Sequence, residues 1–118
     1  MKLQHARKFA LSLPEATEEP HFEYSSFRVR SKIFATVPPD GTVLHIFVDD
    51  EQRAPLIAAY PDVHTPLQWG SKVVGVRVLL APANADTVKR LLTQGWLRKA
   101  PKRLVATLAA HVQASRDG

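Results

Sequence analysis

The spacing of apolar residues changes twice along this chain, and the change restricts the folds that it can adopt. Near the N-terminus, Leu3, Ala6 and Ala10 recur at steps of three and four, which predicts one face of an amphipathic helix. Residues 26–37 instead alternate between apolar and polar side chains, as half-buried strands do. Helical spacing returns in the C-terminal third. We therefore expect an α+β domain, with a mainly antiparallel sheet packed against N-terminal and C-terminal helices.

The middle of the chain predicts strands separated by turns. Apolar residues of one parity mark the first strand-like segment: Phe27, Val29, Ile33, Ala35 and Val37. Within it, Arg30–Lys32 is either a tight turn between two short strands or the middle of one long strand. Turn residues at 38–41 precede a strand at 42–48, and 72–80 predicts one or two more. Residues 15–26 have no apolar stripe, so we interpret them as a connector.

Three further segments predict helices. A short helix follows the acidic residues 49–51, limited by Pro55, and a loop lies between Pro61 and Pro66. Asn84 is a candidate N-cap for a longer helix, and Pro101 suits the start of a last one. The apolar positions of these last two helices are Val88, Leu91, Leu92 and Trp96, then Leu104, Val105, Leu108, Ala109 and Val112. We expect both tryptophans, Trp69 and Trp96, in the core.

Composition narrows the class of protein. The 118 residues suit a single domain, 1–118, and the absence of cysteine excludes disulfides, thiolate metal sites and cysteine nucleophiles. Charged residues interrupt the N-terminal segment where a signal peptide needs an apolar run, and no apolar stretch is long enough to span a bilayer. We expect a cytoplasmic protein that does not bind membranes.

Positive charge is concentrated in the second half of the chain. The net charge is +5, yet residues 1–59 hold 7 basic and 8 acidic side chains, whereas 60–118 hold 9 basic and 3 acidic ones. Residues 87–103 contain six basic side chains and no acidic one. Such a cluster can collect nucleic-acid phosphates, or it can simply solvate helix surfaces.

Two groups of basic residues are the candidates for phosphate contact. Arg28, Arg30 and Lys32 share one face of the strand-like segment, where they line either a DNA-binding hairpin or an ordinary charged sheet edge. Lys102 and Arg103 fall in the first turn of the last helix, so they form an anion site or pair with a carboxylate elsewhere. The full set of predicted nucleic-acid-binding residues is Arg28, Arg30, Lys32, Lys72, Arg77, Lys102 and Arg103.

The sequence offers little support for catalysis or metal binding. Glu18, Glu19, His21 and Glu23 crowd one segment, but their spacing matches no metal motif. No nucleophile elbow or glycine-rich phosphate loop is present. We expect no catalytic residues, no metal and no cofactor.

Four segments carry a family resemblance. They are Leu11-Ser-Leu-Pro14 ahead of acidic residues, Ser26–Ala35, Trp69-Gly70 ahead of Val76-Arg-Val78, and Ala100-Pro-Lys-Arg-Leu104. In this order they resemble the MmcQ/YjbR family of small bacterial proteins. Two departures are Ser31, where the family often has glycine, and Pro55, within a helix usually free of proline.

The resemblance implies a compact fold similar to that of the frataxin homologue CyaY, and DNA binding through a double-wing arrangement. Frataxin-like proteins bind iron through acidic residues on the first helix and strand, but the first helix here carries Lys2, Arg7 and Lys8 and no carboxylate. We therefore expect a non-enzymatic module that binds double-stranded DNA through phosphate contacts. The alternative is a protein-interaction or small-anion-binding module, whose protein partner the sequence does not identify.

Overall fold

The computed structural model describes residues 1–108 and contains three long helices and six strands. Their order and bounds are α1 (Leu3–Ser12), β1 (Ala16–His21), β2 (Tyr24–Val29), β3 (Lys32–Val37), β4 (Val43–Ile46), α2 (Asp50–Ala59), β5 (His64–Trp69), β6 (Lys72–Leu79) and α3 (Ala85–Lys99). A further helical segment covers 102–108. Ala109 and Val112, predicted to belong to this last helix, lie outside the described residues.

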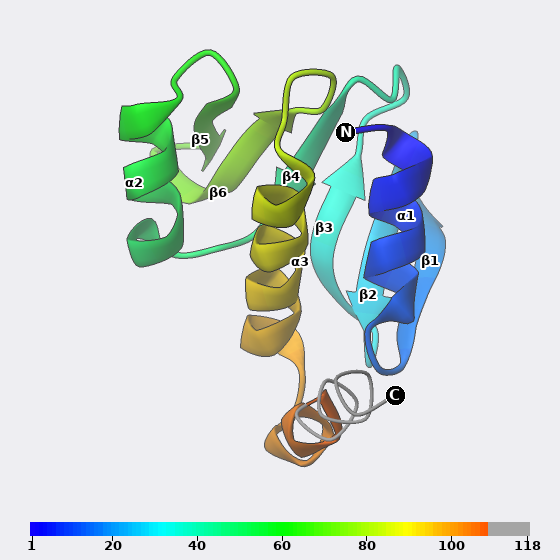
Figure 1. Cartoon of the computed structure of the whole chain (residues 1–118). Helices are drawn as coiled ribbons and strands as arrows, with labels where there is room; N and C mark the ends of the chain where they lie inside the picture. Colours follow the sequence, from blue (N-terminus) through cyan, green and yellow to red (C-terminus); the bar gives the residue numbers. More distant parts are fainter. Residues whose placement is uncertain (109–118) are drawn as a thin grey trace.

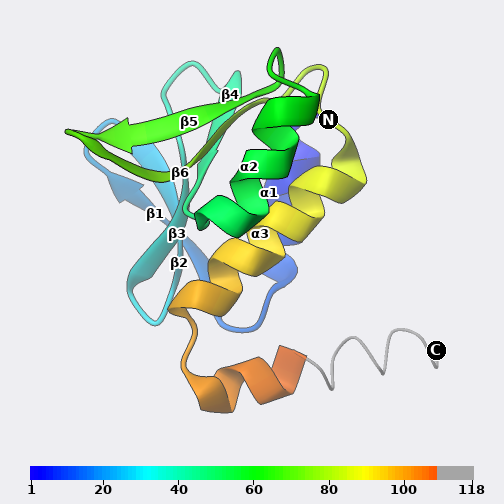
Figure 2. The same ribbon diagram turned by 90° about the vertical axis from the view of Figure 1, so that its left-hand side faces the viewer.

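All six strands pair antiparallel in one sheet, in the order β1-β2-β3-β4-β6-β5. The helices lie on one side of this sheet: α3 packs against β2, β3 and β4, α1 packs against α3 and the edge strand β1, and α2 packs against β5 and β6 (Figures 1 and 2). The opposite face carries no helix from the described part of the chain (Figure 2). The predicted α+β class and its antiparallel sheet are confirmed.

The core forms between the sheet and the helices α1 and α3. Ala6 and Ala10 of α1 are buried, as the helical spacing predicts. From α3, Val88, Leu91, Leu92 and Trp96 are also buried. Small residues allow close packing, since a Cβ on Gly95 would lie 3.2 Å from the Phe34 carbonyl oxygen. The predicted core position of Trp96 is therefore confirmed.

Capping residues define where the helices begin. Asp49 accepts a hydrogen bond from the backbone of Gln52 at the start of α2, and Asn84 accepts one from Thr87 at the start of α3. The predicted cap at Asn84 is confirmed. The helix α2 is short, at 10 residues, and contains Pro55. None of the helices in residues 1–108 has the length and apolar composition needed to cross a bilayer.

Two strands lie where we predicted a connector and a loop. Residues 16–21 form β1 and residues 64–69 form β5, so four strands rather than three precede α2. Both are edge strands, and each contains a proline, Pro20 or Pro66. An edge strand has one row of backbone groups without a partner strand, so it tolerates proline and exposed polar side chains. The polar composition that favoured a connector is thus compatible with an edge strand.

A β-bulge changes which face the first strand-like segment presents. Arg30 and Ser31 form a tight turn between β2 and β3, with φ angles of 50° and 70°. In the register, Phe27 lies opposite Ala35 but Arg28 lies opposite Ile33. Between these two pairs β3 therefore contains one residue more than β2. The prediction that Ile33 shares a face with Ala35 is therefore wrong, because the bulge reverses the alternation.

Candidate nucleic-acid interface

A groove of about 1070 Å³ lies along the helix-free face of the sheet. Its walls come from segments far apart in the sequence. The β1–β2 turn contributes Phe22 and Tyr24, and the β5–β6 hairpin contributes Trp69. The C-terminal end of α3 contributes Arg98 and Lys99. The groove combines aromatic with cationic side chains.

A row of polar residues crosses the floor of this face. Strand register places the members of successive strands directly opposite one another. Because residues opposite each other in antiparallel strands share a face, all of them lie on the helix-free face. The row reads Glu19, Ser26, Thr36, His45, Arg77 and Thr65, from β1 to β5. Its central members Ser26 and Thr36 are buried despite having no helix above them.

His45 occupies the middle of the row and is held neutral. Its Nε2 atom is buried and has no hydrogen-bond partner within residues 1–108. Burial lowers the pKa of His45 below its usual value, and the positive charge of Arg77 lowers this pKa further. The Tyr24 ring lies beside the imidazole, with ring centroids 6.2 Å apart. The floor therefore offers neutral polar groups rather than charge at this point.

Aromatic side chains stand on the rim of the groove. Trp69 is 64% exposed at the end of β5, although we expected it in the core. This prediction is wrong because the β5–β6 hairpin projects beyond the helices, and only Phe47 contacts the indole edge to face, at 5.3 Å between centroids. At the β1–β2 turn, Phe22 is 94% exposed and has a φ of 57°. Core packing therefore does not account for the position of either ring.

Two of the predicted phosphate-binding residues already have partners. Arg28 donates from Nε to Ser26 Oγ at 2.9 Å and lies 3.9 Å from the Glu19 carboxylate. Arg30, in the turn, donates to both Glu15 carboxylate oxygens, at 2.9 and 3.0 Å. Arg28, Arg30 and Lys32 therefore do not form the single basic face that strand alternation predicted.

The remaining predicted residues divide between the groove and the C-terminal segment. Lys32 lines the groove, Arg77 belongs to the polar row, and Lys72 lies directly opposite Trp69 in the hairpin register. Lys102 and Arg103 are exposed in the first turn of 102–108 and do not line the groove. The anion site suggested for this pair stays a prediction.

The structure adds Arg98 and Lys99 to the candidate site. The sequence marks them as part of a basic cluster, but only the packing of α3 brings them beside Lys32 at one end of the groove. No ion pair to Lys32, Arg98 or Lys99 forms within the described chain. A basic pair in the last turn of a helix also interacts favourably with the helix dipole, so part of their role is local.

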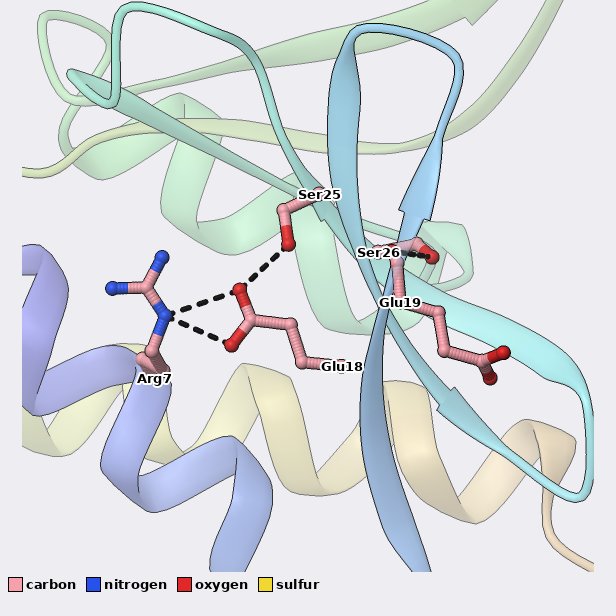
Figure 3. A network of polar contacts seen from close by, with 5 residues as sticks. All are labelled: Arg7, Glu18, Glu19, Ser25 and Ser26. Atoms are coloured by element: carbon pink, nitrogen blue, oxygen red, sulfur yellow. Dashed lines mark hydrogen bonds and ion pairs between the residues drawn. The ribbon is translucent and has the colours of Figure 1, made fainter.

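Of the two acidic residues of β1, Glu18 is engaged inside the fold, whereas the Glu19 side chain is 52% exposed (Figure 3). Glu18 accepts hydrogen bonds from Arg7 Nε at 2.9 Å and from the Ser25 hydroxyl at 2.6 Å. The Ser26 hydroxyl donates to the backbone carbonyl of Glu19, at 2.7 Å. These contacts connect α1, β1 and β2. Among the described residues, no three histidine, aspartate or glutamate side chains come together as a metal site would require.

These features define a class: a small α+β domain whose antiparallel sheet is covered by helices on one face and grooved on the other. The chain belongs to the YjbR family, whose model matches residues 11–98. The crystal structure of Deinococcus radiodurans protein DR2400, described as a DUF419 domain, superposes with a TM-score of 0.74. It is 25% identical in sequence, and the match covers 86% of this chain and 80% of that one. The resemblance seen in the sequence is confirmed.

Curated relatives come from mycobacteria. The proteins Rv2570 of Mycobacterium tuberculosis and Mb2600 of Mycobacterium bovis are each 33% identical to this chain over 75 residues. The matched region is 63% of this chain and 58% of each relative. Both relatives are described as uncharacterized proteins.

Proposed function

We propose that this domain binds DNA without catalysing a reaction, through contacts between basic side chains and phosphates. The observation that carries the proposal is that Lys32, Arg98 and Lys99 line one groove, while strand register places Lys72 opposite its Trp69 and Arg77 opposite its His45. Lysine and arginine side chains that neutralise phosphates release counterions, and this release drives binding.

Two acidic residues that line the groove have partners other than Lys32, Arg98 and Lys99. Asp49 caps α2 through the Gln52 amide. Asp50 lies 3.6 Å from the Arg53 guanidinium, a cation outside the set above. The cations of the groove therefore remain available to an anionic partner.

We assign no catalytic step to the site. Activation of a hydroxyl nucleophile by histidine needs a hydrogen bond between the two groups. Within residues 1–108, no serine or threonine hydroxyl is hydrogen-bonded to a histidine. We therefore propose a binding role for this module and no catalytic one.

A titration with duplex DNA tests the proposal. A short, blunt, fluorescently labelled duplex should bind at low salt, and the affinity should fall steeply between about 50 and 200 mM salt. Fluorescence anisotropy measures both quantities. A chain that shows no binding at the lowest salt concentration would contradict the proposed function.

A further inference from the structure

The most exposed rings on the groove rim are held in position but are not covered. Phe47 contacts Trp69 edge to face, so it fixes the orientation of the indole while 64% of the residue surface stays exposed. Phe22 is exposed at 94% and has a positive φ, which bulky residues rarely adopt. Phe22 lies in the two-residue turn between β1 and β2, and hairpin turns of this length commonly use a positive φ.

Cations accompany the aromatic rings. The register of the β5–β6 hairpin places Lys72 directly opposite Trp69. Lys32, Arg98 and Lys99 line the same groove toward the end of α3. A groove that combines exposed aromatic rings with cations matches a polymeric ligand that carries flat rings and regularly spaced negative charges. Single-stranded nucleic acid has both, since its bases stack on aromatic rings and its phosphates pair with lysine and arginine.

We propose that the groove binds a single-stranded segment of DNA, with Trp69 as the stacking platform for a base and Lys32, Lys72, Arg98 and Lys99 as phosphate contacts. This inference rests on the proposed DNA-binding function and specifies the form of DNA that the groove recognises. A duplex can contact the same cations through its phosphates but does not place a base on Trp69, because its bases are already stacked and would have to be flipped out to reach the indole.

The polar row supports this choice of ligand. Thr36 and His45 line the groove floor and add no charge to it, and the imidazole Nε2 itself is buried. An unpaired base exposes hydrogen-bonding groups along its edge, whereas a paired base uses them within the duplex. A floor of uncharged polar groups below aromatic walls therefore matches unpaired bases better than it matches the phosphate backbone of a duplex.

The test compares two DNA probes that differ only in an unpaired segment. One is a blunt duplex, and the other is the same duplex extended by a single-stranded oligothymidine tail. For the wild-type chain, the tail should raise the affinity by about tenfold and quench tryptophan fluorescence. The quenching reports on Trp69, since Trp96 is fully buried. For Trp69→Ala the gain from the tail, measured as the ratio of this variant's affinities for the two probes, should disappear.

Two variants serve as controls. Tyr60→Ala removes an aromatic ring that is 60% exposed but does not line the groove, so the gain from the tail should be unchanged. Trp69→Phe keeps an aromatic platform and should retain most of the gain while losing the fluorescence change. Thermal unfolding of each variant shows whether the fold is intact.

The outcomes separate this inference from the proposed function. Equal affinity of the two probes for the wild-type chain, or an undiminished gain in Trp69→Ala, overturns the single-strand site and leaves duplex binding standing. Failure of both probes to bind at low salt overturns the DNA-binding function itself, and the single-strand site with it.

Discussion

The indole Nε1 of Trp96 donates a hydrogen bond to the backbone carbonyl of Pro14, at 3.0 Å, across 82 positions of sequence. The bond connects the C-terminal end of the core helix α3 to the turn between α1 and β1. Trp96 is fully buried, and the hydrogen bond itself is partly buried. One side chain therefore fills the core and also fixes the position of the first helix.

Trp96→Phe should destabilise the domain. The substitution leaves the Pro14 carbonyl without its donor and removes part of a buried ring, which together cost about 2–4 kcal/mol. Urea unfolding followed by circular dichroism measures the free energy of unfolding. Trp69→Phe is the matched control and should change it by less than about 0.5 kcal/mol, because Trp69 is exposed. Equal effects of the two substitutions would contradict the assigned roles.

Gly75→Ala should be more harmful than Gly95→Ala. A Cβ on Gly75 would lie 2.1 Å from the Ile46 carbonyl oxygen, so strands β4 and β6 must separate, at a cost of about 1–3 kcal/mol. A Cβ on Gly95 meets its nearest atoms at 3.2 Å, and alanine gains about 1 kcal/mol of helix propensity in return. Thermal unfolding of both variants measures the two losses of stability. A smaller loss for Gly75→Ala than for Gly95→Ala would contradict this ranking.

The Arg7–Glu18 ion pair should contribute measurably to stability. Both side chains are largely shielded, at 28% and 23% exposed, and Glu18 is further held by the Ser25 hydroxyl. A double-mutant cycle with Arg7→Gln and Glu18→Gln should give a coupling energy of about 1 kcal/mol.

The Arg30–Glu15 pair provides a control with similar geometry. It has two hydrogen bonds as well, but its side chains are 52% and 49% exposed, so solvent screens it more strongly. The corresponding cycle with Arg30→Gln and Glu15→Gln should give a smaller coupling energy. An equal or larger value at this exposed pair would show that burial does not set the strength of these interactions.

Stability should fall in mildly acidic solution because of His45. Its folded-state pKa is lowered from the usual 6.5 by burial and by Arg77, so the unfolded chain takes up the proton first. The folded state therefore loses stability as the pH falls below about 6.5, by at most about 1.4 kcal/mol per pH unit for one such group. His45→Gln should flatten the dependence of unfolding free energy on pH in this window. Substituting the exposed His5 with Gln should leave the dependence as it is in the wild-type chain.

Substitutions should distinguish basic residues that line the groove from basic residues that are already in ion pairs, by their effects on DNA binding. Lys32→Ala should weaken duplex binding and lower the salt slope by about 1, as expected for one lost phosphate contact. Arg30→Ala should have a smaller effect, because Glu15 already occupies its guanidinium. Lys8→Ala, on α1 at the opposite face of the sheet, should leave the salt slope unchanged. A uniform loss across the three variants would argue for diffuse attraction rather than a defined interface.

Local sequence patterns were sufficient to predict the helices and the central strands. Helical spacing identifies Ala6 and Ala10, and the cap residue Asn84 sets the start of α3. Patterns failed at the sheet edges, where β1 and β5 carry Pro20 and Pro66 and have few apolar residues. An edge strand is held by backbone pairing on one side, and this pairing requires no alternation of side chains.

The charge distribution followed from the sequence, but the arrangement of the charges did not. The number and position of the basic residues are properties of the chain, and so is the excess in its second half. Tertiary structure decided that Arg28 and Arg30 have partners within the chain, whereas Lys32 lines the same groove as Arg98 and Lys99. It also decided that Trp69 is exposed on the groove rim. Neighbours across a sheet depend on register, and register depends on bulges and pairings between distant residues. The groove is therefore a product of strand pairing and helix placement, which no local pattern encodes.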